Sequence, residues 1–118
     1  MTTYYGSCHC GAVRFSFEHP PIERGLRCNC SYCSRKGALM TPEAFPEELL
    51  RIEAGEQDLG LYQFGRLVAK HYFCKQCGIY TFNETVRKPG FYRANLGCVA
   101  ELDSGLLDVD LFDGQNLL

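Results

Sequence analysis

Cysteines are the side chains in this sequence with the most evident chemistry, and there are eight of them in 118 residues. Seven fall into three short motifs, C-x-C, C-x-C-x-x-C and C-x-x-C. In chain order these are Cys8 and Cys10, then Cys28, Cys30 and Cys33, then Cys74 and Cys77, with Cys98 alone. Such close spacing is typical of metal ligation rather than of a disulfide framework. The start, "MTTYYGSCHCG", lacks the features of a secretory signal. We therefore expect a cytoplasmic protein, and disulfides are rare in that compartment.

The first and last motifs together supply four thiols. In an extended strand, residues i and i+2 point to the same side, so Cys8 and Cys10 can both face one ion. Cys74 and Cys77 flank a tight turn in which Gly78 is free to adopt a positive φ. Four thiolates form the tetrahedral ligand set that structural zinc prefers. The sequence therefore predicts a structural zinc that joins the N-terminal strand to the middle of the chain.

The middle motif supplies three thiols, from Cys28, Cys30 and Cys33. A zinc ion with three protein ligands keeps a coordination position for water or substrate, which is the usual difference between catalytic and structural sites. A thiol that coordinates there loses its proton, so the site is suited to activating a small thiol. Arg35 and Lys36 follow directly. They could attract the carboxylates of such a ligand, or they could belong to an exposed charged loop.

The fourth ligand of the middle motif separates two interpretations. If Cys98 fills that position, the second site is closed, and the protein is a non-catalytic binding module stabilised by zinc. If Cys98 packs in the core as a small apolar side chain, the site stays open. His71 and His9 are two further candidates for the fourth ligand. The sequence alone leaves these alternatives open.

Short strands separated by turns must position the cysteines. Residues 12–17 alternate, with Val13, Phe15 and Phe17 on one face of a strand. Two hairpins are expected, one across 60–74 that turns at Gly65 and Arg66, and one across 78–98 that turns at the "RKPG" segment. The twelve glycines are spread along the chain and favour turns, so the fold is expected to be mostly β.

Two further segments complete the expected fold. Thr41 is a plausible N-cap and Pro42 a plausible first residue of a helix, which Pro46 would limit to about one turn. Residues 49–53 are expected to form a strand. Near the C-terminus, residues 106–114 alternate between apolar and acidic side chains, as in a final strand with Val109 and Leu111 on its apolar face.

Composition excludes several classes of protein. The length and the 46% hydrophobic content suit one domain spanning residues 1–118. No stretch approaches the ~18 apolar residues of a membrane span. The net charge of -2 leaves no basic stripe, which disfavours a nucleic-acid-binding zinc ribbon. We expect small-molecule partners, no nucleic acid and no membrane, while the sequence indicates no oligomeric state.

Three segments, "GSCHCGAVRF", "CNCSYCSRKG" and "HYFCKQCGIYTF", resemble in this order the glutathione-dependent formaldehyde-activating enzyme and centromere-protein-V family. The resemblance implies a mainly β fold of the β-tent type, a small zinc-binding domain of short antiparallel strands. It also implies two zinc sites. The structural zinc is on Cys8, Cys10, Cys74 and Cys77, and a second, more labile zinc is on Cys28, Cys30 and Cys33. Asn29 stands where the family often has histidine.

The resemblance further implies carbon–sulfur lyase chemistry of the S-(hydroxymethyl)glutathione synthase type. Glutathione, or another small thiol as co-substrate, would add reversibly as its thiolate to formaldehyde or a related aldehyde. No general base is evident, and attack by a thiolate on so electrophilic an aldehyde hardly requires one. Tyr80, Asn83 and Asn95, on expected strands near the metal motifs, could donate a hydrogen bond to the developing alkoxide or could serve packing alone.

Overall fold

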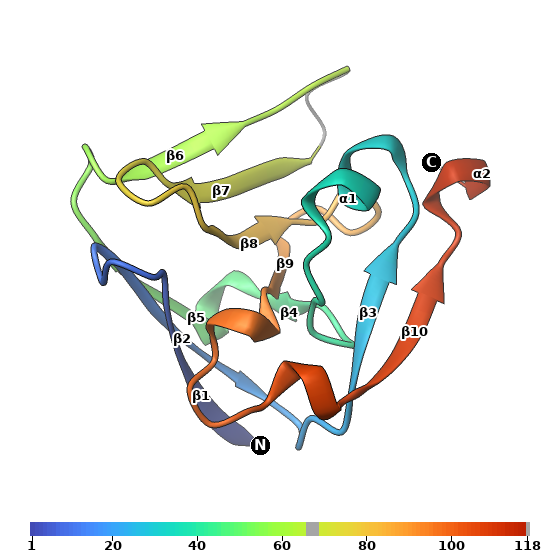
Figure 1. The fold of residues 1–118 in the computed structure, drawn as a ribbon, viewed down its shortest axis with the longest axis horizontal. Helices are drawn as coiled ribbons and strands as arrows, with labels where there is room; N and C mark the ends of the chain where they lie inside the picture. Colours follow the sequence, from blue (N-terminus) through green and yellow to red (C-terminus); the bar gives the residue numbers. More distant parts are fainter. Residues whose placement is uncertain (66–68, 118) are drawn as a thin grey trace.

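The computed structural model describes residues 1–65 and 69–117. Within these residues the strands form three sheets (Figure 1). The first is antiparallel, in the order β1 (Thr2–Ser7), β2 (Val13–His19) and β5 (Leu50–Ala54). The second pairs β3 (Arg24–Cys28) with β10 (Asp108–Phe112). The third is antiparallel, in the order β4 (Phe45–Pro46), β9 (Phe91–Ala94), β8 (Tyr80–Glu84), β7 (Lys70–Cys74) and β6 (Leu59–Tyr62).

Short helices fill the connections between these strands. They are α1 (Ser31–Lys36), the 3-10 turns η1 (Glu47–Leu49), η2 (Leu96–Cys98) and η3 (Ser104–Leu106), and α2 (Gly114–Leu117). The prediction of a mainly β fold with short antiparallel strands is confirmed. No helix among the described residues is long and apolar enough to cross a membrane.

The core lies between the first and third sheets. The alternation predicted for β2 is confirmed, because Val13, Phe15 and Phe17 are all buried. Phe17 stacks on Phe45 with ring centroids 5.0 Å apart, and Phe15 meets the edge of Phe82 at 5.3 Å. Apolar side chains from one strand of the first sheet thus contact two strands of the third. This packing brings the N-terminal segment against the middle of the chain.

Both predicted hairpins are present. In the first, β6 pairs with β7 from Leu59↔Cys74 to Tyr62↔His71. Gly65 adopts the predicted turn conformation with a φ of 61°, while Arg66 lies outside the described residues. The second hairpin joins β8 to β9, and the strand predicted at 49–53 is confirmed as β5.

The helix predicted to begin at Thr41 and Pro42 is wrong. Thr41 is fully buried, and its side-chain oxygen accepts a hydrogen bond from the backbone N–H of Ala94 instead of capping a helix. The carbonyls of Thr41 and Pro42 accept hydrogen bonds from the Arg93 guanidinium, at 2.7 and 2.9 Å. The chain then enters β4 and η1. Tertiary hydrogen bonds therefore override a local helix signal.

The last strand departs from the expectation of antiparallel pairing, because β10 runs parallel to β3. Its apolar face does not enter the core, since Val109 and Leu111 remain 48% and 66% exposed. On the other face, Asp110 accepts two hydrogen bonds of 2.8 Å from the Arg24 guanidinium. β10 thus pairs with β3 at the edge of the fold, and Figure 1 shows that β3 leads toward α1 and β10 toward α2.

Candidate metal centres and the adjoining cavity

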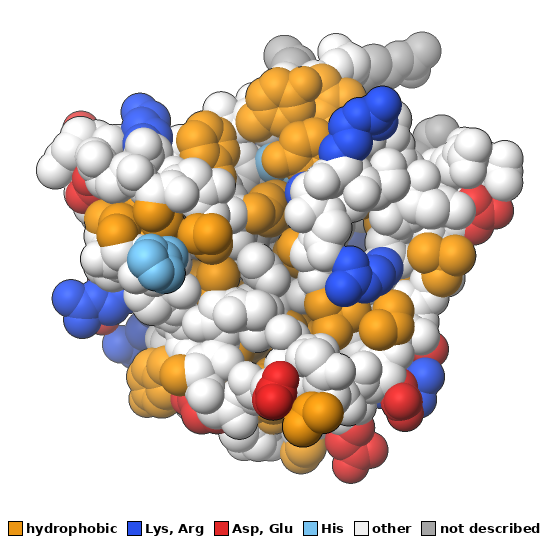
Figure 2. All heavy atoms as spheres, in the orientation of Figure 1, with side chains coloured by type: hydrophobic (Ala, Val, Ile, Leu, Met, Phe, Trp, Pro, Cys, Tyr) orange, Lys and Arg blue, Asp and Glu red, His pale blue; other side chains and the backbone are white. Residues whose placement is uncertain are grey.

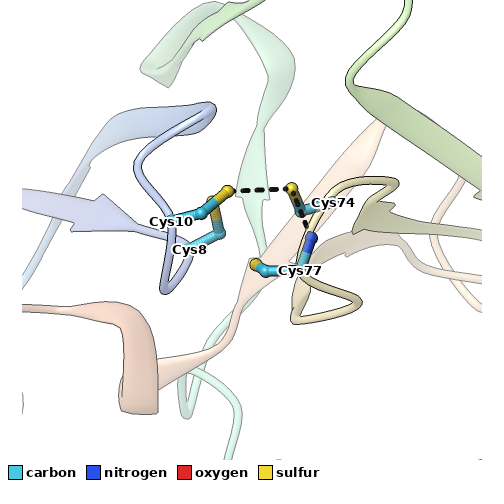
Figure 3. A group of neighbouring side chains, drawn as sticks. All are labelled: Cys8, Cys10, Cys74 and Cys77. Atoms are coloured by element: carbon cyan, nitrogen blue, oxygen red, sulfur yellow. Dashed lines mark hydrogen bonds between the residues drawn. The ribbon is translucent and has the colours of Figure 1, made fainter.

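Cys8, Cys10, Cys74 and Cys77 form the first candidate centre (Figure 3). Their sulfur atoms all lie within 4.8 Å of one another. The sulfur of Cys10 is 3.7 Å from that of Cys8 and 3.7 Å from that of Cys74. A regular tetrahedron with zinc–sulfur bonds of about 2.3 Å has edges of about 3.8 Å, so these separations fit a zinc ion.

The expectation that Cys8 and Cys10 lie on an extended strand is wrong. β1 ends at Ser7, and the C-x-C motif lies in the turn that leads into β2. Gly11 completes this turn with a φ of 84°, a value that favours glycine. The turn brings the sulfurs of Cys8 and Cys10 toward those of Cys74 and Cys77. Strand alternation was expected to do this.

Backbone N–H groups surround the sulfurs of this centre. Val13 donates to the Cys8 sulfur at 3.3 Å, and Gln76 donates to the Cys74 sulfur at the same distance. The N–H groups of Cys10 and Ile79 lower the pKa of Cys77 to about 6. Hydrogen bonds of this kind favour the thiolate, which is the form that binds metal.

Gly78 takes the predicted positive φ, at 80°. Its backbone N–H donates to the carbonyl of Cys74 and closes the turn that carries Cys74 and Cys77. The second half of this centre is therefore built as the sequence predicts.

Cys28, Cys30 and Cys33 form the second candidate centre, and their sulfurs also lie within 4.8 Å of one another. Cys28 is the last residue of β3, Cys30 caps the N-terminus of α1, and Cys33 lies within that helix. The N–H of Cys30 donates to the Cys28 sulfur at 3.4 Å, and the N–H of Cys33 donates to the Cys30 sulfur at 3.3 Å. Burial opposes ionisation of Cys30, but the N–H of Cys33 and the neighbouring thiols hold the pKa of Cys30 below its ordinary value. These donors suit a metal that is bound through three thiolates.

Asn29 ties this motif to the C-terminal segment. Its amide nitrogen donates to Asp113 at 3.0 Å, and its amide oxygen accepts from the N–H of Gln115 at 2.8 Å. Its backbone N–H donates to the carbonyl of Phe112 at the end of β10. Asn29 therefore positions the C-terminal segment against the motif.

The alternative in which Cys98 closes the second centre is wrong. Cys98 packs against the core, and its thiol donates to the carbonyl of Tyr80 at 3.6 Å. Burial, together with the neighbouring thiols of Cys8 and Cys77, raises the pKa of Cys98 to about 11. Cys98 therefore sits beside the first centre. His9 is exposed and belongs to the turn of that same centre.

A cavity of about 980 Å³ adjoins the second centre, and Cys28, Cys30 and Cys33 all line it. This volume is in the range of small-molecule sites. Lys36, Asn83 and Arg93 are also in its wall, as are His71 and the 84–88 segment. Figure 2 shows hydrophobic side chains gathered at the surface between the β6–β7 hairpin and α1. The second centre thus opens onto a hollow that could receive a ligand.

The two basic residues predicted to hold a ligand's carboxylates lie in different places. Lys36 lines the cavity, as Cys33 does, and its ammonium group lies 4.1 Å from the centre of the Tyr80 ring. Burial lowers the pKa of Lys36, while the neighbouring Cys33 raises it. Arg35 is exposed, and its guanidinium donates to the carbonyl of Ser31 one helical turn earlier. The structure brings Lys36 to the site and turns Arg35 away from it.

Sequence reasoning missed two basic residues of the cavity wall. Arg87 and Lys88, in the loop between β8 and β9, also line the cavity. The Arg87 guanidinium lies 5.1 Å from the centre of the Phe112 ring, and the Lys88 ammonium lies 4.0 Å from that of Phe91. The two adjacent basic residues of the "RKPG" segment were a signal for an anionic ligand, but the segment was interpreted only as a turn.

His71, Tyr80 and Asn83 form a hydrogen-bonded group beside the second centre. The Tyr80 hydroxyl is 2.7 Å from Nδ1 of His71, and the Asn83 amide nitrogen donates to that hydroxyl at 2.9 Å. Asn95 serves structure, because its amide donates to the carbonyl of Tyr80 and its oxygen caps η2. His71 is therefore near the three cysteines without belonging to their group of candidate ligands.

With this geometry established, comparison with known proteins identifies the family. A sequence profile described as "Glutathione-dependent formaldehyde-activating enzyme" matches residues 3–112. This chain belongs to that family. A crystal structure of a Rhodobacter sphaeroides protein is similar, with a TM-score of 0.82 and 36% sequence identity, and the match covers 92% of this chain and 99% of that one. Membership of the glutathione-dependent formaldehyde-activating family and the two cysteine groups together fit a zinc-binding, formaldehyde-activating protein.

Proposed function

We propose that this protein is a carbon–sulfur lyase that joins a small anionic thiol, glutathione in the first instance, reversibly to formaldehyde or a related small aldehyde. One observation carries the proposal. The sulfurs of Cys28, Cys30 and Cys33 converge at the wall of a cavity, and among the described residues this group has three candidate ligands instead of four. A ligand set of three is typical of catalytic zinc. The abundance of metal-binding thiols favours the cytoplasm as the compartment.

Cys28, Cys30 and Cys33 are the residues that would hold this zinc, and Cys8, Cys10, Cys74 and Cys77 those that would hold the structural one. Bound zinc would lower the pKa of a coordinating thiol and so supply a thiolate at neutral pH.

The cavity wall accounts for the preference for an anionic thiol. Lys36, Arg87 and Lys88 line it. Glu84, an acidic residue of the same wall, is already engaged by the backbone N–H of Gly90 at 2.9 Å and by the Lys70 ammonium at 3.9 Å. No ion pair among the described residues engages Lys36, Arg87 or Lys88, and such cationic side chains attract the carboxylates of a ligand such as glutathione. Lys36 is the last residue of α1, while Arg87 and Lys88 lie in the loop between β8 and β9, so the ligand would be held from two different elements.

In the reaction, the thiolate sulfur attacks the carbonyl carbon of the aldehyde and forms the carbon–sulfur bond. The electron pair of the carbonyl π bond moves to oxygen, which takes a proton from water. The reverse reaction returns that proton and breaks the carbon–sulfur bond. The thiol has already lost its proton, so the step requires no general base.

Exchange NMR of thiol and formaldehyde mixtures tests the proposal. The wild type should accelerate hemithioacetal exchange above the buffer rate, with glutathione preferred over uncharged thiols. Cys30→Ser should abolish the acceleration and retain one equivalent of zinc, because the two centres share no ligand. Cys98→Ser is the matched control and should stay active. If the wild type accelerates exchange with no thiol, the enzymatic proposal fails and a zinc-stabilised binding module becomes the better account.

A further inference from the structure

His71 stands in a row of side chains on the cavity side of the third sheet. It is paired with Tyr62 on β6 and with Asn83 on β8, and Asn83 is paired with Arg93 on β9. Directly opposite residues in antiparallel strands share a face. His71, Asn83 and Arg93 all line the cavity, whereas Tyr72, the next residue of β7, packs on the core against Phe82. This face of the sheet is thus turned toward the second centre.

An irregularity in strand pairing adds Tyr80 to this group. Strict alternation would place Tyr80 and Asn83 on opposite faces, because they are three positions apart. The register between β7 and β8 shifts at Tyr72 and Phe73, so that Tyr72 pairs with Phe82 but Phe73 pairs with Tyr80. A shift of this kind re-aims the side chain next to it. The hydroxyl of Tyr80 consequently reaches both Asn83 and His71.

The hydrogen bonds favour one tautomer of His71, in which Nδ1 accepts from the Tyr80 hydroxyl. The Asn83 amide nitrogen can only donate, so the Tyr80 hydroxyl accepts from it at 2.9 Å. The hydroxyl's own proton is then available to Nδ1 of His71, 2.7 Å away. A neutral imidazole that accepts at Nδ1 carries its proton on Nε2.

His71 is held neutral and in place. It is 5% exposed, and burial, with a smaller effect from the Lys36 charge, lowers its pKa to about 4. Its ring packs against Tyr32, with centroids 4.2 Å apart, and against Phe64 at 5.8 Å. The ring therefore presents an uncharged N–H in a fixed direction.

The Nε2 atom is accessible from the cavity. Among the described residues, the fully buried side-chain nitrogen or oxygen without a hydrogen-bond partner is Nε2 of His19. Nε2 of His71 also has no hydrogen-bond partner among the described residues, but unlike Nε2 of His19 it is not fully buried. His71 lines the cavity, which leaves its Nε2 atom available to a ligand in that space.

We infer that His71 is a catalytic residue whose Nε2–H donates a hydrogen bond to the aldehyde oxygen, and that Tyr80 and Asn83 are positioning residues that fix its tautomer. The inference rests on the proposed function. As the sulfur–carbon bond forms, the carbonyl electron pair moves to oxygen, and the Nε2–H stabilises the developing negative charge. The oxygen then takes its proton from water, and His71 keeps its own. A preorganised donor of this kind acts mainly on the rate of the chemical step.

The tautomer can be observed without any activity assay. Long-range proton–nitrogen correlation NMR on ¹⁵N-labelled protein should show His71 neutral at pH 7, with the proton on Nε2. Tyr80→Phe removes the donor to Nδ1 and should give a mixture of the two tautomers. Tyr72→Phe, which removes a hydroxyl from the opposite face, should leave the Nε2–H signature unchanged. A proton on Nδ1 of the wild-type ring would overturn the inference.

Kinetics test the catalytic role. His71→Phe should lower the rate constant of thiol addition about 100-fold, the usual effect of losing one such donor, and leave thiol affinity unchanged. His71→Gln, whose amide nitrogen can replace Nε2, should recover part of the rate. Tyr80→Phe should lie between the wild type and His71→Phe, and Tyr72→Phe should match the wild type. Zinc content and circular dichroism identify variants that fail to fold. If His71→Phe fails to fold, the rate constants of His71→Gln and Tyr80→Phe test the catalytic role instead.

The two proposals fail in different ways. A wild type that accelerates exchange, together with a His71→Phe variant of equal rate constant, would overturn the role of His71 and leave the proposed function standing. A wild type that does not accelerate exchange would overturn both. Loss of thiol affinity in His71→Phe at an unchanged rate constant would assign His71 to binding and contradict the inference.

Discussion

Replacement of Cys74 by serine should show how much the first centre stabilises the fold. Cys74 is fully buried, so no water can readily replace the lost sulfur, and a serine hydroxyl is a poor zinc ligand. We expect the variant to lose the metal from this centre. A cross-link between the C-x-C turn and the β7–β8 turn is lost with it.

The magnitude follows from the length of chain that the metal closes. Cys10 and Cys74 are 64 positions apart, and their sulfurs lie 3.7 Å from each other. Closing a loop of that length restricts the unfolded chain by about 4 kcal/mol when treated as a covalent cross-link. A domain of this size has a free energy of unfolding of about 5–15 kcal/mol. For a chain of 118 residues, such a loss corresponds to a melting temperature lower by about 15 °C.

Thermal unfolding followed by circular dichroism measures the melting temperature, and zinc quantified on the same samples measures the loss of metal. Cys98→Ser is the matched control, since Cys98 lies beside this centre without belonging to its ligand group. It should keep both zinc equivalents and melt close to the wild type. A Cys74→Ser protein that retains two equivalents of zinc and melts with the wild type would refute the assignment of Cys74. Loss of one zinc with an unchanged melting temperature would refute the claim that the metal stabilises the fold.

Two further outcomes are expected. A mild chelator should remove about one equivalent of zinc, that of the three-thiolate centre, and leave the circular dichroism spectrum largely unchanged; loss of both equivalents together with unfolding would contradict two distinct centres. Arg87→Ala and Lys88→Ala should each raise the KM for glutathione by about 1.4- to fivefold with little change in kcat, because an exposed ion pair contributes about 0.2–1 kcal/mol. The Arg35→Ala control should leave KM unchanged. An equal effect in all three variants would show that the preference for an anionic thiol comes from the overall charge of the protein and not from Arg87 and Lys88.

Local spacing was enough to predict the metal motifs and most of the strands. The C-x-x-C turn forms as expected because Gly78 adopts a positive φ and the backbone N–H groups around the turn point at the sulfurs. The alternation of Val13, Phe15 and Phe17 likewise predicted which face of β2 is buried. Such features depend on residues a few positions apart, whose geometry the covalent chain restricts. The family resemblance, carried by the same motifs, was confirmed for that reason.

Features that depend on contacts between distant segments required the tertiary structure. Thr41 has the local features of a helix N-cap, but its hydroxyl bonds to Ala94, more than fifty positions away. Cys98 could have closed the second centre or packed in the core, and the structure places it in the core, beside the first centre.

The cavity and the hydrogen bonds of His71 also depend on contacts between distant segments. Lys36, on α1, and Arg87, in the loop between β8 and β9, line the same cavity. Tyr80 meets His71 because the pairing of β7 with β8 shifts its register between them, and no sequence pattern revealed that shift. The sequence alone indicated which residues could bind a metal, because the spacing within each cysteine motif is local. The tertiary structure decided what surrounds the second centre, because strand register and long-range packing set the direction of each side chain.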